Sequence, residues 1–143
     1  MVDNFIKREN IFDKYIFEDD ENDKVGSTAV VKKAINQTDG NIYGIKCICI
    51  NDYEKDKVLS EIKILKELNH PNIVKVYEAY CEDETEFCFI VFEWMEGGEL
   101  FERIDSNKHK EDLVKELFRK LVDGVRYCHR LGIVHRDLKV SLL

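Results

Sequence analysis

Two short motifs hold the side chains of this chain that could do chemistry. The first is Tyr43-Gly44-Ile45-Lys46, and a carboxylate, Glu61, follows it on the next predicted helix. A lysine held by a carboxylate can present a fixed positive charge to an anionic ligand. The second motif, His135-Arg136-Asp137-Leu138-Lys139, offers an aspartate that could accept a proton. Taken singly, lysine and glutamate are usually solvated surface residues, so their structural setting decides what they can do.

The predicted elements place the first motif on a strand and the second after a long helix. Residues 42–50 are rich in β-branched side chains, which predicts a strand. Apolar residues recur at helical spacing through 53–69, and Pro71 then ends that helix. We also expect strands within 10–34, at 73–79 and at 87–92. Helices are expected at 99–104 and 111–131, and Gly132 would cap the C-terminus of the second of these helices. Strands followed by helices predict an α+β fold.

The composition predicts a globular chain without a nucleic-acid or membrane partner. The chain has 143 residues, is 44% hydrophobic and carries a net charge of -7, which disfavours binding to a phosphate backbone. Its longest strongly apolar run, 87–92, is far shorter than the roughly 20 residues of a membrane span. The N-terminus has no signal-peptide pattern, and Val2 stands where N-myristoylation requires glycine. We expect a cytoplasmic protein, with the nucleus as an alternative.

The cysteines predict packing more than redox or metal chemistry. Their number is odd and no Cys-x-x-Cys pair occurs, so neither a zinc site nor a disulfide framework is indicated. We interpret them as packing residues with reduced thiols, typical of an intracellular compartment. The five are Cys47, Cys49, Cys81, Cys88 and Cys128.

The motifs follow one another in the order found in eukaryotic protein kinases, and the chain resembles that family over about residues 11–139. Between the two motifs already named, His70-Pro71-Asn72-Ile73-Val74 closes the first helix. The segment from Glu93 to Ile104 is most similar to the calcium/calmodulin-dependent group, including calcium-dependent kinases. The resemblance implies a serine/threonine kinase, which transfers the ATP γ-phosphate to protein hydroxyls.

The same resemblance implies the domain organisation. An N-terminal extension (1–10) would precede the kinase N-lobe and hinge (11–95), built from a five-stranded antiparallel sheet and one helix. The first helices of an incomplete helical C-lobe (96–143) would follow and stop inside the catalytic loop, so the chain resembles a truncated kinase. The apolar stripe of the long helix would then lack its usual cover. We expect a chaperone or another protein to bind there, besides the protein substrate.

ATP-binding residues follow from the resemblance. Lys46 would reach the α and β phosphates, and Glu61 would hold it in place. Val31 would cap the adenine, with Gly44 beside it on the next strand. In the window of the glycine-rich loop only Gly26 remains, so a plain hairpin turn is the alternative there.

The hinge and the catalytic loop complete the implied site. Phe92 would be a bulky gatekeeper, and the Glu93 carbonyl and Met95 backbone would bond the base. Glu99 would meet ribose or a basic substrate residue, with a plain helix-start acid as the alternative. In the catalytic loop, Asp137 would accept the substrate proton and Lys139 would neutralise the transferred phosphate, as in Ser/Thr kinases.

One position breaks the family pattern. Leu142 stands where the family has an asparagine that binds Mg²⁺, and leucine has no oxygen ligand. The metal-binding Asp-Phe-Gly segment does not occur in the sequence either. The family uses Mg²⁺, but we expect no metal site in this chain and no turnover from it. The alternative is a nucleotide-binding, pseudokinase-like module with a regulatory or interaction role.

Overall fold

The computed structural model divides the chain into two compact units. The first holds residues 1–68 and 75–94, and the second holds residues 69–74 and 95–143. The residues that the structure describes are 5–18, 24–25, 29–50, 52–81, 86–97 and 111–138.

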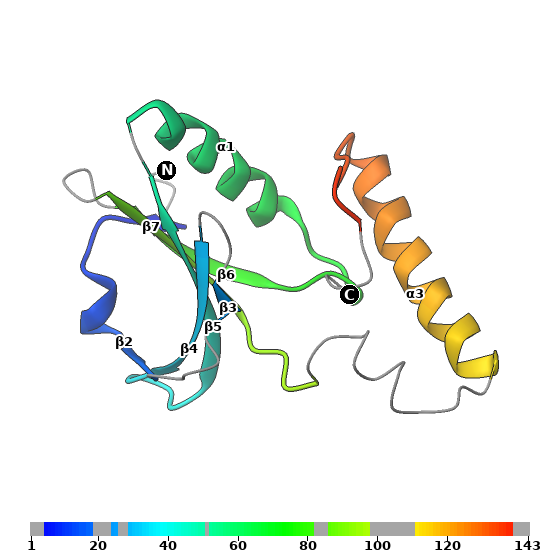
Figure 1. Cartoon of the computed structure of the whole chain (residues 1–143), viewed down its shortest axis with the longest axis horizontal. Helices are drawn as coiled ribbons and strands as arrows, with labels where there is room; N and C mark the ends of the chain where they lie inside the picture. The colour runs from blue at the N-terminus through cyan, green and yellow to red at the C-terminus, as the bar shows by residue number, and fades with distance from the viewer. Residues whose placement is uncertain are drawn as a thin grey trace. The chain divides into compact units, whose positions relative to one another are not determined.

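A sheet with one helix, α1 (Asp52–Glu67), makes up the described part of the first unit (Figure 1). Six strands follow one another across the sheet in the order β1-β6-β7-β5-β4-β2, and β3 also pairs with β4. A 3-10 turn, η1 (Ile11–Asp13), precedes β2. The strands are β1 (Ile6–Lys7), β2 (Tyr15–Phe17), β3 (Lys24–Val25), β4 (Ala29–Asn36), β5 (Ile42–Cys49), β6 (Val76–Cys81) and β7 (Phe87–Glu93). The predicted α+β class is therefore confirmed.

The expected sheet of five antiparallel strands needs correction at its outer edge. β1 pairs with β6 in parallel, with Ile6 opposite Ala79, so the sheet continues into the predicted N-terminal extension. The two residues of β1 are too few to show an alternating pattern, so no strand could be predicted there. The strand expected at 73–79 begins only at Val76.

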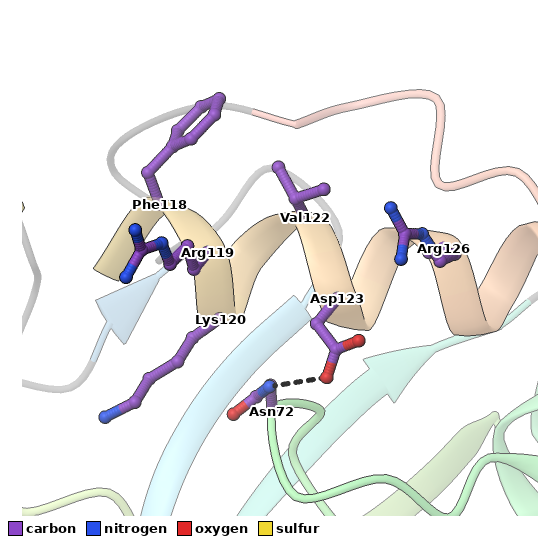
Figure 2. Close-up of a pocket in the computed structure, with 7 residues that line it drawn as sticks. All are labelled: Asn72, Phe118, Arg119, Lys120, Val122, Asp123 and Arg126. Carbon is purple, nitrogen blue, oxygen red and sulfur yellow. Dashed lines mark hydrogen bonds between the residues drawn. The ribbon is translucent and has the colours of Figure 1, made fainter. Parts of the chain in front are cut away.

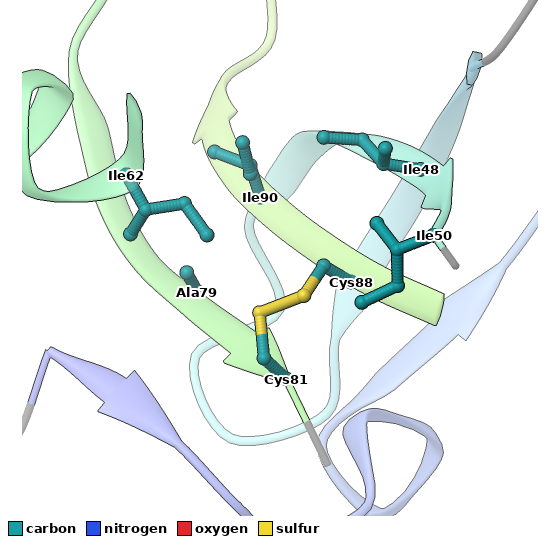
Figure 3. Packing of buried hydrophobic residues seen from close by; sticks show 7 residues of the cluster. All are labelled: Ile48, Ile50, Ile62, Ala79, Cys81, Cys88 and Ile90. Atoms are coloured by element: carbon teal, nitrogen blue, oxygen red, sulfur yellow. A yellow bond between two sulfur atoms is a disulfide. The ribbon is translucent and has the colours of Figure 1, made fainter. Parts of the chain in front are cut away.

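The two faces of the sheet bury different groups of side chains, because successive residues of a strand point to opposite faces. α1 covers one face, where Ile62 is fully buried. The buried residues around it are Ile48, Ile50, Ala79, Cys81, Cys88 and Ile90 (Figure 3). The other face buries Ile11, Tyr15, Ala34, Ile45, Tyr80 and Val91. Burial of one isoleucine of this kind contributes about 1.5–3 kcal/mol, so Ile62 fixes α1 firmly on its face.

A disulfide joins β6 to β7, which corrects the expectation of reduced packing cysteines for this pair. Cys81 and Cys88 lie opposite each other in the register of the two strands, with Cα atoms 4.5 Å apart (Figure 3). Both are buried. Cys-x-x-Cys spacing does not identify such a pair, because the distance in sequence between two cysteines that face each other across a hairpin depends on the length of the hairpin.

The second unit is built on α3 (Glu111–Arg130), close to the predicted span of 111–131. Gly132 ends the helix with a φ of 73°, as the sequence predicted. The Ile133 amide reaches back to the Cys128 carbonyl at 2.9 Å, which satisfies a helix-end acceptor. The helix expected at 99–104 lies outside the described residues.

The segment 69–74 packs on α3 within the second unit. His70 Nε2 lies 3.3 Å from the Asp123 carboxylate, and the Asn69 amide donates to the Tyr127 hydroxyl at 3.1 Å. Figure 2 shows the hydrogen bond from Asn72 to Asp123 in a pocket along the helix. That pocket is lined by Asn72, Phe118, Arg119, Lys120, Val122, Asp123 and Arg126. In the described part of the chain, no helix has the length and apolar character needed to traverse a bilayer.

Candidate functional site

Lys46 and Glu61 meet on the face of the sheet that α1 covers. Lys46 Nζ lies 3.8 Å from Glu61 Oε1. The lysine sits on the central strand β5, and Glu61 directly precedes the buried Ile62 on α1. The side chains are 39% and 55% exposed, so the pair contributes only about 0–1 kcal/mol to stability. The packing of α1, more than the ion pair, determines where the carboxylate lies.

Two apolar side chains flank the lysine in the register of the sheet. Val31 on β4 and Ile90 on β7 each stand opposite Lys46. Directly opposed residues share a face, so these side chains lie on either side of the lysine stem. The sequence predicted Val31 as a site residue but missed Ile90. Its place two residues before Phe92 on the same strand is the signal that could have found it.

Gly44 and Phe92 form the next pair along the same face. They are opposed in the register of β5 and β7. A Cβ atom built on Gly44 would lie 2.6 Å from Cζ of the Phe92 ring. The ring of Phe92, the predicted gatekeeper, therefore lies against the backbone of Gly44. It fills the space that the methyl group of an alanine would need there.

The predicted hinge residues are Glu93, at the end of β7, and Met95. The Glu93 side chain accepts a hydrogen bond from the Lys75 amide at 2.7 Å, and its own amide donates to the Lys75 carbonyl at 2.9 Å. These bonds fix the end of β7 against the start of β6. Met95 belongs to the second unit and its side chain is exposed.

Asp137 lies in an exposed turn of the second unit. Its backbone amide donates to His135 Nδ1 at 3.3 Å, which assigns that ring nitrogen as an acceptor. Arg136, between the two, adopts a left-handed φ of 66°. Such a conformation costs a non-glycine residue about 1–2 kcal/mol. Strain of this kind clusters at functional sites.

Four predicted site residues lie outside the described part of the chain: Gly26, Glu99, Lys139 and Leu142. Among the described residues, no group of three or more histidine, cysteine, aspartate or glutamate side chains could hold a metal ion. The described part of the site therefore consists of an ammonium–carboxylate pair flanked by apolar side chains, a glycine covered by a phenyl ring, and the hydrogen-bonded end of β7. Such a surface can hold a polyanion that carries a flat apolar group.

Comparison with known proteins adds a family match. A family model described as "Protein kinase domain" matches residues 23–142. The "Probable serine/threonine-protein kinase fhkE" of Dictyostelium discoideum is 40% identical over 121 residues, which cover 80% of this chain and 17% of that protein.

Two further relatives are similar to the same extent. "CBL-interacting serine/threonine-protein kinase 21" of Arabidopsis thaliana is 40% identical over 118 residues, covering 80% of this chain and 28% of that protein. "Calcium/calmodulin-dependent protein kinase type 1" of Caenorhabditis briggsae is 38% identical over 118 residues, covering 80% of this chain and 33% of that protein. The chain thus spans at most about a third of the length of these relatives.

Proposed function

Since this chain belongs to the protein kinase family, we propose that its first unit is the nucleotide-binding lobe of a serine/threonine kinase. The reaction would transfer the γ-phosphate of ATP to a hydroxyl group of a protein. The observation that carries this proposal is the Lys46–Glu61 pair, 3.8 Å apart on the helix-covered face of the sheet.

Lys46 is suited to the phosphate chain by its charge and its fixed place. Its backbone lies in the middle of a strand that is paired on both sides. Glu61 neutralises the ammonium only in part at 3.8 Å, so the lysine keeps hydrogen-bond donors for a phosphate oxygen. Phosphoryl transfer depends mostly on such positioning and charge stabilisation.

The adenine would lie against the apolar surface next to Lys46. Val31 and Gly44 supply that surface from β4 and β5, and Phe92 restricts its depth at Gly44. Backbone groups of Glu93 and Met95 would bond the base, and Gly26 and Glu99 would complete the site.

In the second unit, Asp137 would accept the proton of the substrate hydroxyl while Lys139 neutralises the transferred phosphate. The acidic Glu99 would favour substrates with basic residues near the phosphorylated side chain. We propose the cytoplasm as the location, with the nucleus as the alternative, because ATP is abundant in both. The reducing conditions of these compartments work against the Cys81–Cys88 disulfide.

Kinases of this family use ATP with Mg²⁺. Mg²⁺ requires oxygen ligands, and Leu142 supplies none. The residues of this chain therefore do not fit the metal, and no step is assigned to it. This mismatch favours a second candidate function, a regulatory or interaction module that binds nucleotide without turning it over.

Isothermal titration of the full chain with ATP tests the binding step. Wild type should bind, and Lys46→Ala should weaken binding by about tenfold or more, equal to about 1.4 kcal/mol. Lys32→Ala is the matched control, because Lys32 lies on neighbouring β4 opposite Ile45, on the face away from Lys46. Equal affinity of wild type and Lys46→Ala would rule out the proposed site.

A phosphotransfer assay separates the two candidate functions. Turnover by wild type that disappears in Asp137→Ala would establish the kinase activity. ATP binding without turnover in either protein would establish the binding module.

A further inference from the structure

The N-terminal strand lies next to α1 at the edge of the sheet. β1 pairs with β6 in parallel, and the Ala79 amide donates a hydrogen bond to the Phe5 carbonyl at 3.0 Å. The kinase family match begins only at residue 23, so this strand lies outside the matched domain. Residues 5–7 thus add a strand to the edge at which α1 is attached.

Phe5 packs into the same cluster that holds α1. Both Phe5 and Ile6 contact the core around the buried Ile62. The α1 residues that join them there are Val58, Leu59 and Leu65. In addition, Lys66 Nζ lies 5.7 Å from the centre of the Phe5 ring, within range of a cation–π contact. The phenyl ring therefore links the added strand to the last turn of the helix.

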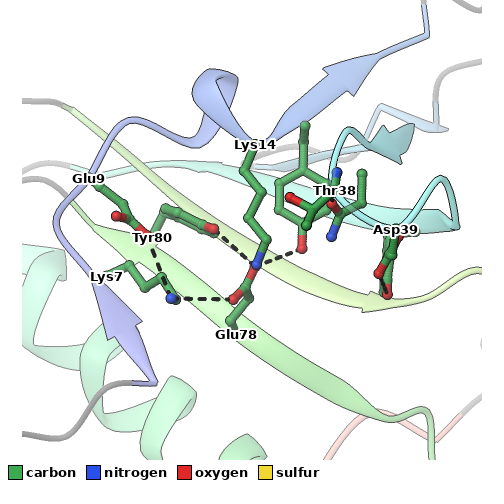
Figure 4. A network of polar contacts seen from close by, with 10 residues as sticks. Lys7, Glu9, Lys14, Thr38, Asp39, Glu78 and Tyr80 are labelled. Carbon is green, nitrogen blue, oxygen red and sulfur yellow. Dashed lines mark hydrogen bonds and ion pairs between the residues drawn. The ribbon is translucent and has the colours of Figure 1, made fainter.

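The opposite face of the sheet holds β1 in its register. Lys7 Nζ lies 3.8 Å from Glu78 Oε2 and 3.5 Å from Glu9 Oε1 (Figure 4). Glu78 is itself buried, and it also accepts hydrogen bonds from Lys14 and Tyr15. β1 is thus held by a polar network on one face and by apolar packing on the other.

We propose that residues 5–7, and Phe5 above all, are a positioning segment that sets α1 and thereby the place of Glu61 beside Lys46. The ion pair is too exposed to hold a helix by itself, so the packing of α1 must determine the distance. Phe5 supplies part of that packing from outside the family domain. The inference rests on the proposed function, since its consequence is nucleotide affinity.

Substitution of Phe5 in the full chain tests this role. Phe5→Ala should weaken ATP binding by about tenfold and speed amide exchange in α1, while Phe5→Leu should restore most of both. Phe12→Ala is the matched control, because it removes the same ring from η1, where the aromatic contacts are with Phe17 and Phe89. Unchanged exchange in α1, or equal effects of Phe5→Ala and Phe12→Ala, would overturn the proposal.

A double substitution separates positioning from general stabilisation. If Phe5 acts through Glu61, adding Phe5→Ala to Glu61→Gln should cause no further loss of ATP affinity. Losses that multiply would overturn the proposal. Should Phe5→Ala fail to fold, as judged by circular dichroism, Lys66→Ala carries the same comparison, because it removes the cation–π contact with the Phe5 ring.

The failure of the proposed function would show itself separately. If wild type does not bind ATP, the kinase assignment of the site fails. Exchange in α1 still decides whether Phe5 positions the helix, because that measurement requires no nucleotide.

Discussion

Gly44 lies opposite Phe92 in the register of β5 and β7, and the phenyl ring covers the glycine. Gly44→Ala should therefore lower the free energy of unfolding by about 1–3 kcal/mol, because the new methyl group overlaps the ring. Phe92→Leu in the same chain should recover most of that loss. Urea unfolding of the two single variants and the double variant measures the coupling. An unchanged urea midpoint in Gly44→Ala would show that the ring moves aside freely.

Among the described residues of the first unit, Glu78 is a buried acid, and its environment predicts a pH dependence. Burial acts to raise the pKa of Glu78, but hydrogen bonds from Lys14, Tyr15 and Tyr80 outweigh it and hold the pKa below its usual value. A lowered pKa in the folded state stabilises the fold above the unfolded pKa of about 4.3. This stability is lost as the pH falls through the folded pKa.

The tyrosines around Glu78 predict a second loss of folding stability, at high pH. Burial, and next the hydrogen bond to Glu78, raise the pKa of both Tyr15 and Tyr80. Their contribution is present below the unfolded pKa of about 10 and is lost at higher pH. The urea midpoint should thus fall at both acid and alkaline pH. Glu78→Gln should make the fall at acid pH smaller. If the urea midpoint of Glu78→Gln falls at acid pH as steeply as that of the wild type, the role of Glu78 is contradicted.

The residue patterns could predict some of these partners but not others. Lys46 and Glu61 were found because each belongs to a motif in a fixed order. The network on Glu78 was not, because Lys14 and Tyr15 are more than 60 residues away in the sequence and no motif links them to Glu78. Phe5 was missed for the same reason, as a single aromatic in a segment of two strand residues carries no periodic signal.

At the scale of elements, the disulfide is the feature of the β6–β7 pair that reducing conditions can change. Cys81 and Cys88 are separated by 7 residues, and closing a loop of that size stabilises by about 2–3 kcal/mol in the chain-entropy account. Reductant should therefore lower the urea midpoint of the first unit. The double variant Cys81→Ser with Cys88→Ser should show a midpoint that no longer responds to reductant. A wild-type midpoint equal in both conditions would show that the bond adds no stability.

The boundaries of elements show which physical signals a sequence carries. The helix expected at 53–69 is observed as Asp52–Glu67, because apolar spacing and Pro71 report directly on a helix and its end. The strand expected at 73–79 starts only at Val76, and the residues before it belong to the segment 69–74, which bonds to α3 through His70 and Asn72. Those bonds are long-range, and apolar content alone does not show them.

At the scale of the whole chain, the described residues of the second unit bury fewer apolar side chains than those of the first. The expectation that the predicted stripe of the long helix lacks its cover stays a prediction, while several large apolar side chains of the described chain are exposed. On α3 these are Leu113, Val114, Phe118 and Val122, with Phe118 63% exposed. The stripe predicted from helical spacing consists of Leu113, Leu117, Leu121, Val125 and Cys128. Of these, Leu113 is exposed and the other four are half-buried. An exposed apolar side chain forfeits the stabilisation of about 1.5–3 kcal/mol that full burial would give it.

Local interactions cannot make up for that missing burial. The pairs Glu111–Lys115 and Glu116–Lys120 lie one helical turn apart, at 2.6 and 2.7 Å. Each such pair contributes only about 0.2–0.5 kcal/mol. In proteins most of the stability of a helix comes from tertiary packing, and among the described residues the contacts of Asp123 and Tyr127 with residues 69–74 help to hold α3 in its unit.

These energies predict that the two units open separately. In hydrogen exchange on the full chain, amides of α3 should exchange about a hundredfold faster than those of β5 and β7, because local opening is easier where few apolar groups are buried. Asp123→Ala should speed exchange in α3 and in 69–74 while leaving β5 unchanged, since it removes the partner of His70 and Asn72. Asp112→Ala, at an exposed position in the first turn of the same helix, is the control. Strong protection of 111–130 in a monomer, equal to that of the central strands, would contradict the prediction, because it would mean that α3 shares the cooperative unfolding of the sheet.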